Sequence, residues 1–301
     1  MARGPSSRRG ADLGRFVSRI RGMGRKPLVA TLAAVSAVGF ATALFAHGRD
    51  GEGFRSSSDA RIGALEREGR DRDDPRPNWG RRTIGRSVRG RPIELLSASD
   101  GRLGLDPNDK PDVLLVGCIH GTECDGIEVI RRLRHGRAPV ADLDVIPNLN
   151  PDGRRLGTRL NARGVDLNRN FAARWEPLQS RGDPQYSGPR PFSEPETRIA
   201  RHTIRTLDPD VTIWFHQHAE AGLVRAWGPS APAARRYASV AGSPFHELPW
   251  LPGTAPNWQN HRFPGTASFV VEFPLAGPSA EEADRHAAAI ESLAGVRAGR
   301  G

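Results

Sequence analysis

Residues 114–124 read LLVGCIHGTEC, and this short stretch sets the interpretation of the whole chain. An apolar run of buried-strand type, Val113–Gly117, leads into a turn, and Glu123–His135 then follows with helical spacing. The turn carries His120 and Glu123, and an imidazole and a carboxylate three residues apart can face one metal ion. A surface histidine and a glutamate favoured by the helix dipole would explain the pair equally well.

Strands and helices alternate along residues 79–298, which we expect to form one folded domain. The predicted strands are Thr83–Val88, Pro92–Ser97, Val113–Gly117, Leu143–Leu149, Val211–Phe215, Leu223–Trp227 and Ser268–Phe273. The predicted helices are Glu123–His135, a helix that follows Ser193 and ends at about Leu207, and Ala280 to about Ala294. Ser193 is the predicted N-cap of the second helix, and Glu196, three residues later, would complete a capping box. The alternation predicts an α/β fold, a three-layer α/β/α domain with a mixed, largely parallel sheet. Ligands of such a fold bind at the carboxyl ends of the strands.

A second candidate ligand group follows another predicted strand. The sequence TIWFHQH, residues 212–218, places His216 at the end of an apolar run and His218 two residues later. Side chains two residues apart on a strand point to the same face, so both could face one site. Two ordinary histidines at the rim of a sheet are the alternative. Together with His120 and Glu123, one of them would complete the set of two histidines and one glutamate that suits a catalytic zinc ion.

Two further segments carry charge where an ordinary strand or loop does not need it. Glu272 interrupts the apolar strand ASFVVEFP, residues 267–274, and a carboxylate there costs free energy unless it is paired or used. Beside a metal-activated water it would be a natural general base; a glutamate at an exposed strand end is the alternative. The stretch NLNPDGRRLGTRLNARGVDLNRNF, residues 148–171, holds five arginines and five asparagines, a combination that suits recognition of a carboxylate.

As a set, these motifs resemble the zinc carboxypeptidase family, and most of all its bacterial branch, which includes murein peptide amidases. The resemblance covers roughly residues 79–295. It rests on His-Gly-Thr-Glu, Asn-Pro-Asp-Gly, Gly-Val-Asp-Leu-Asn-Arg-Asn-Phe, the late strand-end histidine and the late Val-Glu-Phe, which occur in the family's order and spacing.

The resemblance implies a role for eight residues. His120, Glu123 and His216 would bind one zinc ion, with His216 preferred to His218 because it directly ends the strand. Asp166 would orient His120. Arg159 would polarise the scissile carbonyl. Asn168 and Arg169 would clamp the terminal carboxylate of the substrate. Glu272 would move a proton from water to the leaving amine.

One loop departs from the family pattern. Many members place a tyrosine on a mobile loop before the catalytic glutamate, but residues 246–262, HELPWLPGTAPNWQNHR, contain none. Trp250 or Trp258 would then cover the site. The loop has no acidic residue after Glu247, which argues against a strong preference for lysine or arginine side chains.

The implied function is zinc-dependent hydrolysis of a peptide or amide bond near a free carboxylate, with peptidoglycan stem peptides as the most available substrate outside a bacterial membrane. A zinc-dependent deacylase of small N-acyl amino acids is one alternative. A membrane-tethered inactive binding protein on the same scaffold is another.

The region before residue 79 has three parts. Residues 1–26 hold eight basic side chains against Asp12 alone, so most of the net charge of +10 belongs to this tail and does not indicate a nucleic-acid partner. Residues 27–46 carry no charge and are long enough to span a hydrocarbon core, and residues 47–78 are typical of a linker. The positive-inside rule predicts a membrane anchor with the domain outside the cytoplasm, or a secreted protein if 27–46 is a cleaved signal.

The chain has two cysteines, Cys118 and Cys124. We expect two small buried side chains, with a disulfide as the alternative in an oxidising compartment.

Overall fold

The computed structural model describes residues 79–98, 112–136, 142–218 and 222–296. The predicted tail 1–26, apolar segment 27–46 and linker 47–78 lie outside the described residues, so the membrane anchor remains a prediction. Among the helices that the structure describes, none is long and apolar enough to cross a membrane.

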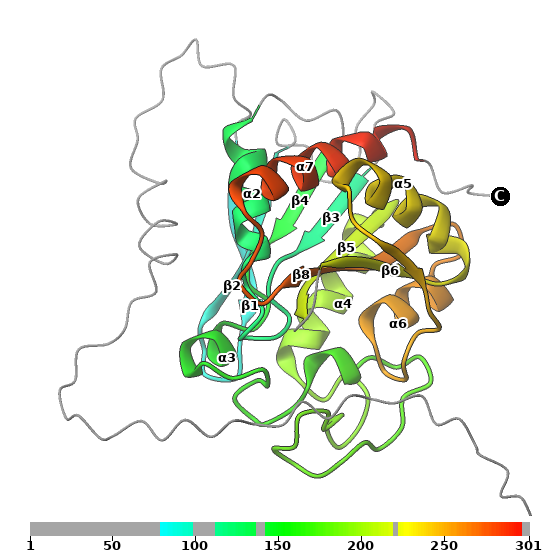
Figure 1. Ribbon diagram of the computed structural model, residues 1–301. Coiled ribbons are helices and arrows are strands. Elements are labelled where there is room, and N and C mark those ends of the chain that lie inside the picture. The colour runs from blue at the N-terminus through cyan, green and yellow to red at the C-terminus, as the bar shows by residue number, and fades with distance from the viewer. Residues whose placement is uncertain (1–78, 99–111, 137–141, 219–221, 297–301) are drawn as a thin grey trace, which may run out of the picture. The chain divides into compact units, whose positions relative to one another are not determined.

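One mixed sheet of eight strands forms the centre of the domain, in the order β1-β2-β4-β3-β5-β8-β6-β7 (Figure 1). Its strands are β1 (Gly80–Arg86), β2 (Pro92–Ser97), β3 (Asp112–Val116), β4 (Asp142–Ile146), β5 (Val211–His218), β6 (Leu223–Ala226), β7 (Phe245–Glu247) and β8 (Ala267–Pro274). The four central strands, β4, β3, β5 and β8, run parallel to one another. The hairpin of β1 and β2 closes one edge in antiparallel register, and β6 joins β8 antiparallel near the other edge. The mixed α/β sheet predicted from the sequence is therefore confirmed.

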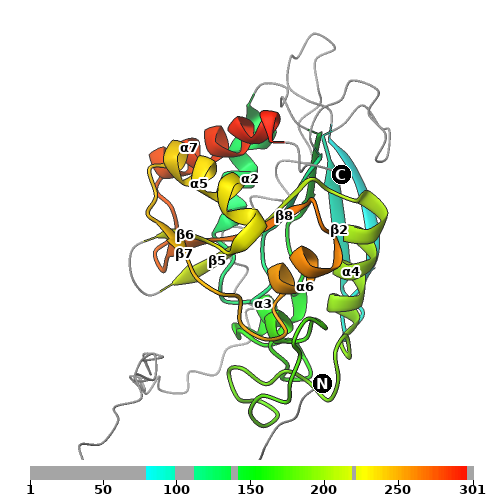
Figure 2. The ribbon, with the colours of Figure 1, turned by 90° about the vertical axis from the view of Figure 1, so that its right-hand side faces the viewer.

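Helices cover both faces of this sheet (Figures 1 and 2). On one face lie α2 (Gly126–His135), α5 (Ala231–Ala241) and α7 (Ala280–Glu291), and on the other α4 (Pro195–Leu207) and α6 (Ala255–Arg262). The short helix α3 (Pro151–Leu156) follows β4. Because helices pack on both sides, the central strands bury both faces and read as nearly continuous apolar runs, as in Val113–Val116.

Several predicted boundaries differ from the observed ones. The strand β5 continues two residues past His216, and β4 ends at Ile146, three residues before the predicted end. The helix α2 begins at Gly126 because Glu123 belongs to the turn and not to the helix. The final helix ends at Glu291 and continues as a 3₁₀ turn, Ser292–Gly295.

The predicted capping box of α4 is wrong. The N-cap is Glu194, and its side chain makes no capping hydrogen bond. Ser193 instead donates from Oγ to the Glu194 carboxylate at 2.8 Å. The Glu196 carboxylate accepts from the backbone N–H of Val88 at 3.0 Å, in the turn of the β1–β2 hairpin. A partner more than one hundred residues away thus takes the carboxylate that the local sequence pattern assigns to the cap.

Among the α-helices and strands that the structure describes, α3, α5, α6 and β7 were not predicted. The helix α6 lies within residues 246–262, which we expected to be a mobile loop. Its first turn holds Pro256, which suits the start of a helix but also suits a loop. The segment lacks the amphipathic pattern that predicts a surface helix, because apolar and polar side chains alike, Ala255, Trp258 and Gln259, are buried.

Candidate metal centre and active site

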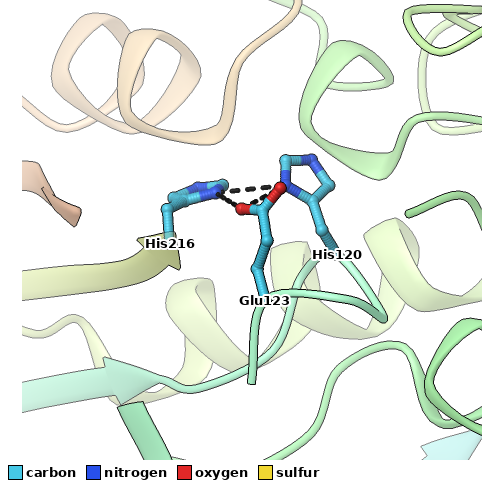
Figure 3. A group of neighbouring side chains, drawn as sticks. All are labelled: His120, Glu123 and His216. Atoms are coloured by element: carbon cyan, nitrogen blue, oxygen red, sulfur yellow. Dashed lines mark hydrogen bonds and ion pairs between the residues drawn. The ribbon is translucent and has the colours of Figure 1, made fainter. Parts of the chain in front are cut away.

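Three side chains meet beyond the carboxyl ends of β3 and β5 (Figure 3). His120 and Glu123 lie on the turn after β3, and His216 lies near the end of β5. The Nδ1 atoms of the two histidines are 3.1 Å apart. Both face the same Glu123 oxygen, Oε2, at 2.9 Å from His120 and 2.8 Å from His216. The three side chains are buried, and the structure brings together the predicted metal ligands.

The geometry of these atoms fits a zinc ion. Neighbouring ligands of a tetrahedral zinc ion with bonds of about 2.0–2.1 Å lie about 3.3 Å apart, so the three atoms need to spread only slightly. Two imidazole nitrogens and one carboxylate oxygen are also a ligand set that catalytic zinc sites use, with a fourth position left for water or substrate. His218 ends β5, but its side chain lies outside the described residues, so the preference for His216 rests on the position of His216 itself.

Electrostatics in the metal-free site keep the glutamate charged. Burial alone would raise the pKa of Glu123, but the adjacent His120 and His216 hold it well below its ordinary value. Burial and Arg159 lower the pKa of His120, but the carboxylates of Glu123 and Asp166 outweigh them and raise it. A cation therefore suits this position, since it would face a carboxylate that is already ionised.

The turn that carries His120 and Glu123 is held by the Asn-Pro-Asp-Gly segment. Asn150 caps α3 by accepting from the N–H of Gly153 at 2.9 Å, and its Nδ2 donates to the carbonyl of Ile119 at 3.3 Å. A Cβ atom on Gly121 would lie 2.1 Å from the carbonyl carbon of Gly153, so only glycine permits this approach. Sequence reasoning assigned no role to Asn150 or Gly121, because each contact joins segments about 30 residues apart.

The expectation of two unpaired cysteines is wrong. Cys118 and Cys124 form a disulfide, and their Cα atoms are 4.8 Å apart, within the range that a disulfide spans. The same tight turn that directs His120 and Glu123 to one point brings the two cysteines together. The disulfide therefore closes the loop that presents both ligands.

Asp166 lies where the predicted orienting role requires it. Its Oδ1 is 3.0 Å from Nε2 of His120, the ring nitrogen that points away from the metal position. Its other oxygen, Oδ2, accepts from Nη2 of Arg159 at 3.1 Å. Burial would raise the pKa of Asp166, but Arg159 and His120 keep it well below its ordinary value. A carboxylate in this position fixes the orientation and tautomer of the histidine.

A cavity of about 160 Å³ opens beside the candidate metal position. Glu272 lines it, and its position follows from the sheet: in the parallel register of β5 and β8, Glu272 lies directly beside His216. Arg159 lines the same cavity, and its guanidinium also contacts Glu123. The sheet thus places the Glu272 carboxylate, and the segment after α3 places the Arg159 guanidinium, in the lining of the cavity.

Asn168 and Arg169, which we expected to act together, differ in what they bind. Both polar atoms of the Asn168 side chain have partners: Nδ2 lies 3.3 Å from Nε2 of His216, and Oδ1 accepts from the N–H of Ala255 at 2.9 Å. Arg169 donates from Nη1 to the carbonyl of Asn168 at 2.8 Å and from Nη2 to Oε1 of Gln185 at 3.4 Å, and its buried Nε has no hydrogen-bond partner among the described residues. Arg169 therefore has donor capacity to spare, whereas Asn168 contacts a metal ligand.

The outer wall of the cavity comes from the segment before α6. Gly253 has a φ of +68°, and a Cβ atom there would lie 2.2 Å from the carbonyl oxygen of Arg169. The N–H of Phe171 donates to the Gly253 carbonyl at 2.9 Å, which fastens the segment to the chain that follows Arg169. Trp250 consequently lines the cavity. Trp258 is buried against Phe171 and does not line the cavity, so of the two alternatives the structure places Trp250 at the site.

Gln217 and Arg225 are among the residues of the cavity to which sequence reasoning assigned no role. The backbone N–H of Gln217 donates to Oε2 of Glu123 at 3.3 Å. Arg225 lies on β6 with its guanidinium over the ring of Trp250, 5.7 Å from the ring centre. Gln217 lies between the two histidines of TIWFHQH but was given no role, and only the pairing of β6 with β8 brings Arg225 to the site.

Comparisons with known proteins agree with this geometry. The sequence model of the zinc carboxypeptidase family matches residues 77–240, more than half of the chain. Murein peptide amidase A of Escherichia coli (strain K12) is 31% identical over 149 residues, which cover 46% of this chain and 59% of that protein. Carboxypeptidase B of Astacus astacus is 27% identical over 175 residues, 48% of this chain and 56% of that protein. The chain therefore matches little more than half the length of either relative.

Solved structures share the fold. Murein-tripeptide amidase MpaA from Escherichia coli O157 superposes with a TM-score of 0.58 at 26% identity, covering 74% of this chain and 95% of that one. Carboxypeptidase A from Helicoverpa armigera gives a TM-score of 0.57 at 20% identity, covering 79% of this chain and 70% of that one, and supports the fold alone.

Proposed function

Because the chain belongs to the zinc carboxypeptidase family, we propose that it is a zinc-dependent metallopeptidase that hydrolyses an amide bond next to a free carboxylate. The observation that carries the proposal is the convergence of His120, Glu123 and His216 beside a cavity that also holds Glu272 and Arg169. An inactive binding protein would have no need to keep the metal ligands, the base and the carboxylate site together.

The side chains around the cavity divide the reaction between them. Bound zinc would polarise the scissile carbonyl and make a water molecule more acidic. Glu272 is placed to accept the proton of the attacking water and to deliver it to the leaving amine. Arg159, held by Asp166, is placed to donate hydrogen bonds to the carbonyl oxygen as negative charge develops there.

A peptide of the bacterial cell wall is the substrate that we propose. The names of two relatives, murein peptide amidase A and murein-tripeptide amidase, support this choice. The test is to incubate the purified protein and zinc with muropeptides, with C-terminally free peptides and with N-acyl amino acids, and to identify products by mass spectrometry. Cleavage of N-acyl amino acids alone would favour a deacylase over a peptidase.

Arg169 should distinguish a terminal carboxylate from its amide. The substrate carboxylate is charged before and during the reaction, so replacing Arg169 with Ala should raise KM. The wild type should hydrolyse a peptide acid about 10- to 100-fold better than the matching amide, as kcat/KM, because a hydrogen bond to a charged group is lost. The Arg169→Ala variant should discriminate far less. Equal preference in both proteins would remove Arg169 from carboxylate binding and leave the metal site unaffected.

We also propose that residues 27–46 hold the domain at the outer side of a bacterial membrane. The support is the uncharged apolar segment after a basic tail, and the Cys118–Cys124 disulfide suits an oxidising compartment. Protease added to intact spheroplasts should then degrade the domain, and protection until lysis would contradict the proposal.

A further inference from the structure

Arg225 is the one arginine of the cavity that the proposed chemistry does not use. It lies on β6, which pairs with β8 in antiparallel register, with Arg225 opposite Val270 and Leu223 opposite Glu272. Residues opposite each other in such a pair share a face of the sheet, and diagonal neighbours lie about 7–8 Å apart. Arg225 therefore projects to the same face as Glu272, two residue pairs farther from the metal position.

One nitrogen of the Arg225 guanidinium donates a hydrogen bond to the protein, and another has no partner among the described residues. Its Nη2 donates to the carbonyl of Pro249 at 2.7 Å, and it lies over the ring of Trp250. Its Nε is buried and has no hydrogen-bond partner in the described part of the chain. Within the part of the chain that the structure describes, no carboxylate forms an ion pair with Arg225. Burial lowers the pKa of Arg225, and the more distant charge of Glu272 counteracts this effect only in part. A half-buried cation with open donors costs free energy until an anion reaches it.

The cavity therefore holds two arginines besides Arg159. Arg169 and Arg225 both line it, each with a buried Nε that has no hydrogen-bond partner among the described residues, and the positive charge of Arg169 adds to burial in lowering the pKa of Arg225. The neighbouring lining is apolar, as Trp250, Leu251 and Val270 show. One terminal carboxylate can satisfy one of these arginines. A second anionic group is needed for the other.

We propose that Arg225 selects substrates whose C-terminal residue carries a second carboxylate on its side chain, such as a glutamyl or aspartyl residue. This inference rests on the proposed function. Arg169 then binds the α-carboxylate and Arg225 binds the side-chain carboxylate, while the apolar wall packs against the methylene groups between them. A neutral side chain of the same shape leaves Arg225 desolvated and unpaired, so the site rejects it.

The test compares isosteric substrates in one enzyme preparation. N-acyl dipeptides that end in Glu or Gln, and in Asp or Asn, are hydrolysed by the zinc-loaded wild type, by Arg225→Gln and by Arg225→Lys. We expect the wild type to favour the acid by about 10- to 100-fold in kcat/KM, the range for a hydrogen bond to a charged group. The preference should fall at least about tenfold in Arg225→Gln and be retained in part in Arg225→Lys, which keeps the charge but loses the planar fork of donors. Because the readout is a ratio within each protein, partial misfolding of a variant cancels.

The outcomes separate this inference from the function on which it rests. Hydrolysis of all four peptides with no preference for the acids, or with the same preference in Arg225→Gln as in the wild type, overturns the role of Arg225 and leaves the peptidase standing. No hydrolysis of any peptide by the wild type overturns both. Arg205→Gln, a change on the exposed surface of α4, is the matched control and should leave the preference unchanged.

Discussion

Replacing Glu272 with Gln is expected to lower kcat by about 10²–10⁴, the range for a positioned general base, while the protein keeps its zinc. Glutamine has nearly the size and polarity of glutamate, but it cannot accept the proton of the attacking water. The side chain lies beside His216 in the β5–β8 register, close to the metal position without being one of its three ligands. Steady-state kinetics and metal analysis of the same preparation would measure both effects.

The matched control is Glu281→Gln, because Glu281 is exposed on α7, where it pairs with Arg285. Its kcat should stay within about twofold of the wild type, as expected for a surface change. A Glu272→Gln variant with normal kcat would mean that another group accepts the proton. The test is informative because the family match ends at residue 240, so the role of Glu272 rests on the sequence resemblance and on its position in the sheet.

The residues that meet at the site could be predicted because of the way parallel strands end. His120, His216 and Glu272 follow or interrupt three apolar runs, and those runs became the neighbouring parallel strands β3, β5 and β8. The carboxyl ends of parallel strands meet at one edge of the sheet, so polar residues at those ends converge without any specific loop structure. A strand-end pattern in the sequence thus carries three-dimensional information.

The parts that were not predicted depend on contacts between distant segments. The capping box failed because Val88 takes the Glu196 carboxylate. The disulfide was misjudged because the closeness of Cys118 and Cys124 depends on how sharply the intervening turn closes, which spacing does not show. Arg225 carries no local signal at all, since any short strand of alternating pattern tolerates an arginine. For the cap of α4 and for Arg225 the deciding partner lies in a distant segment, and for the disulfide it is the shape of a local turn that decides.

The effect of losing a metal ligand should be the largest of all. Replacing His216 with Ala removes one of the three side chains that converge within 4.8 Å, and leaves Glu123 buried with one imidazole fewer to balance its charge. We expect bound zinc to fall from about one ion per chain to below a tenth under dilute zinc, and kcat/KM to fall by at least about 10³, since Lewis-acid stabilisation is worth several kcal/mol.

The same loss should appear in stability. Zinc at about 1,000 times its dissociation constant would stabilise the folded domain by about 4 kcal/mol, which corresponds to a shift in Tm of roughly 10 °C for a domain of this size. A chelator should therefore lower the Tm of the wild type by about that amount, and zinc should restore it, whereas the Tm of His216→Ala should respond little to either. His202→Ala, which changes an exposed histidine on α4, should behave as the wild type does. If His216→Ala still bound one zinc ion and kept its activity, His216 would not be a ligand, and His218, two residues along the same strand, would become the residue to replace next.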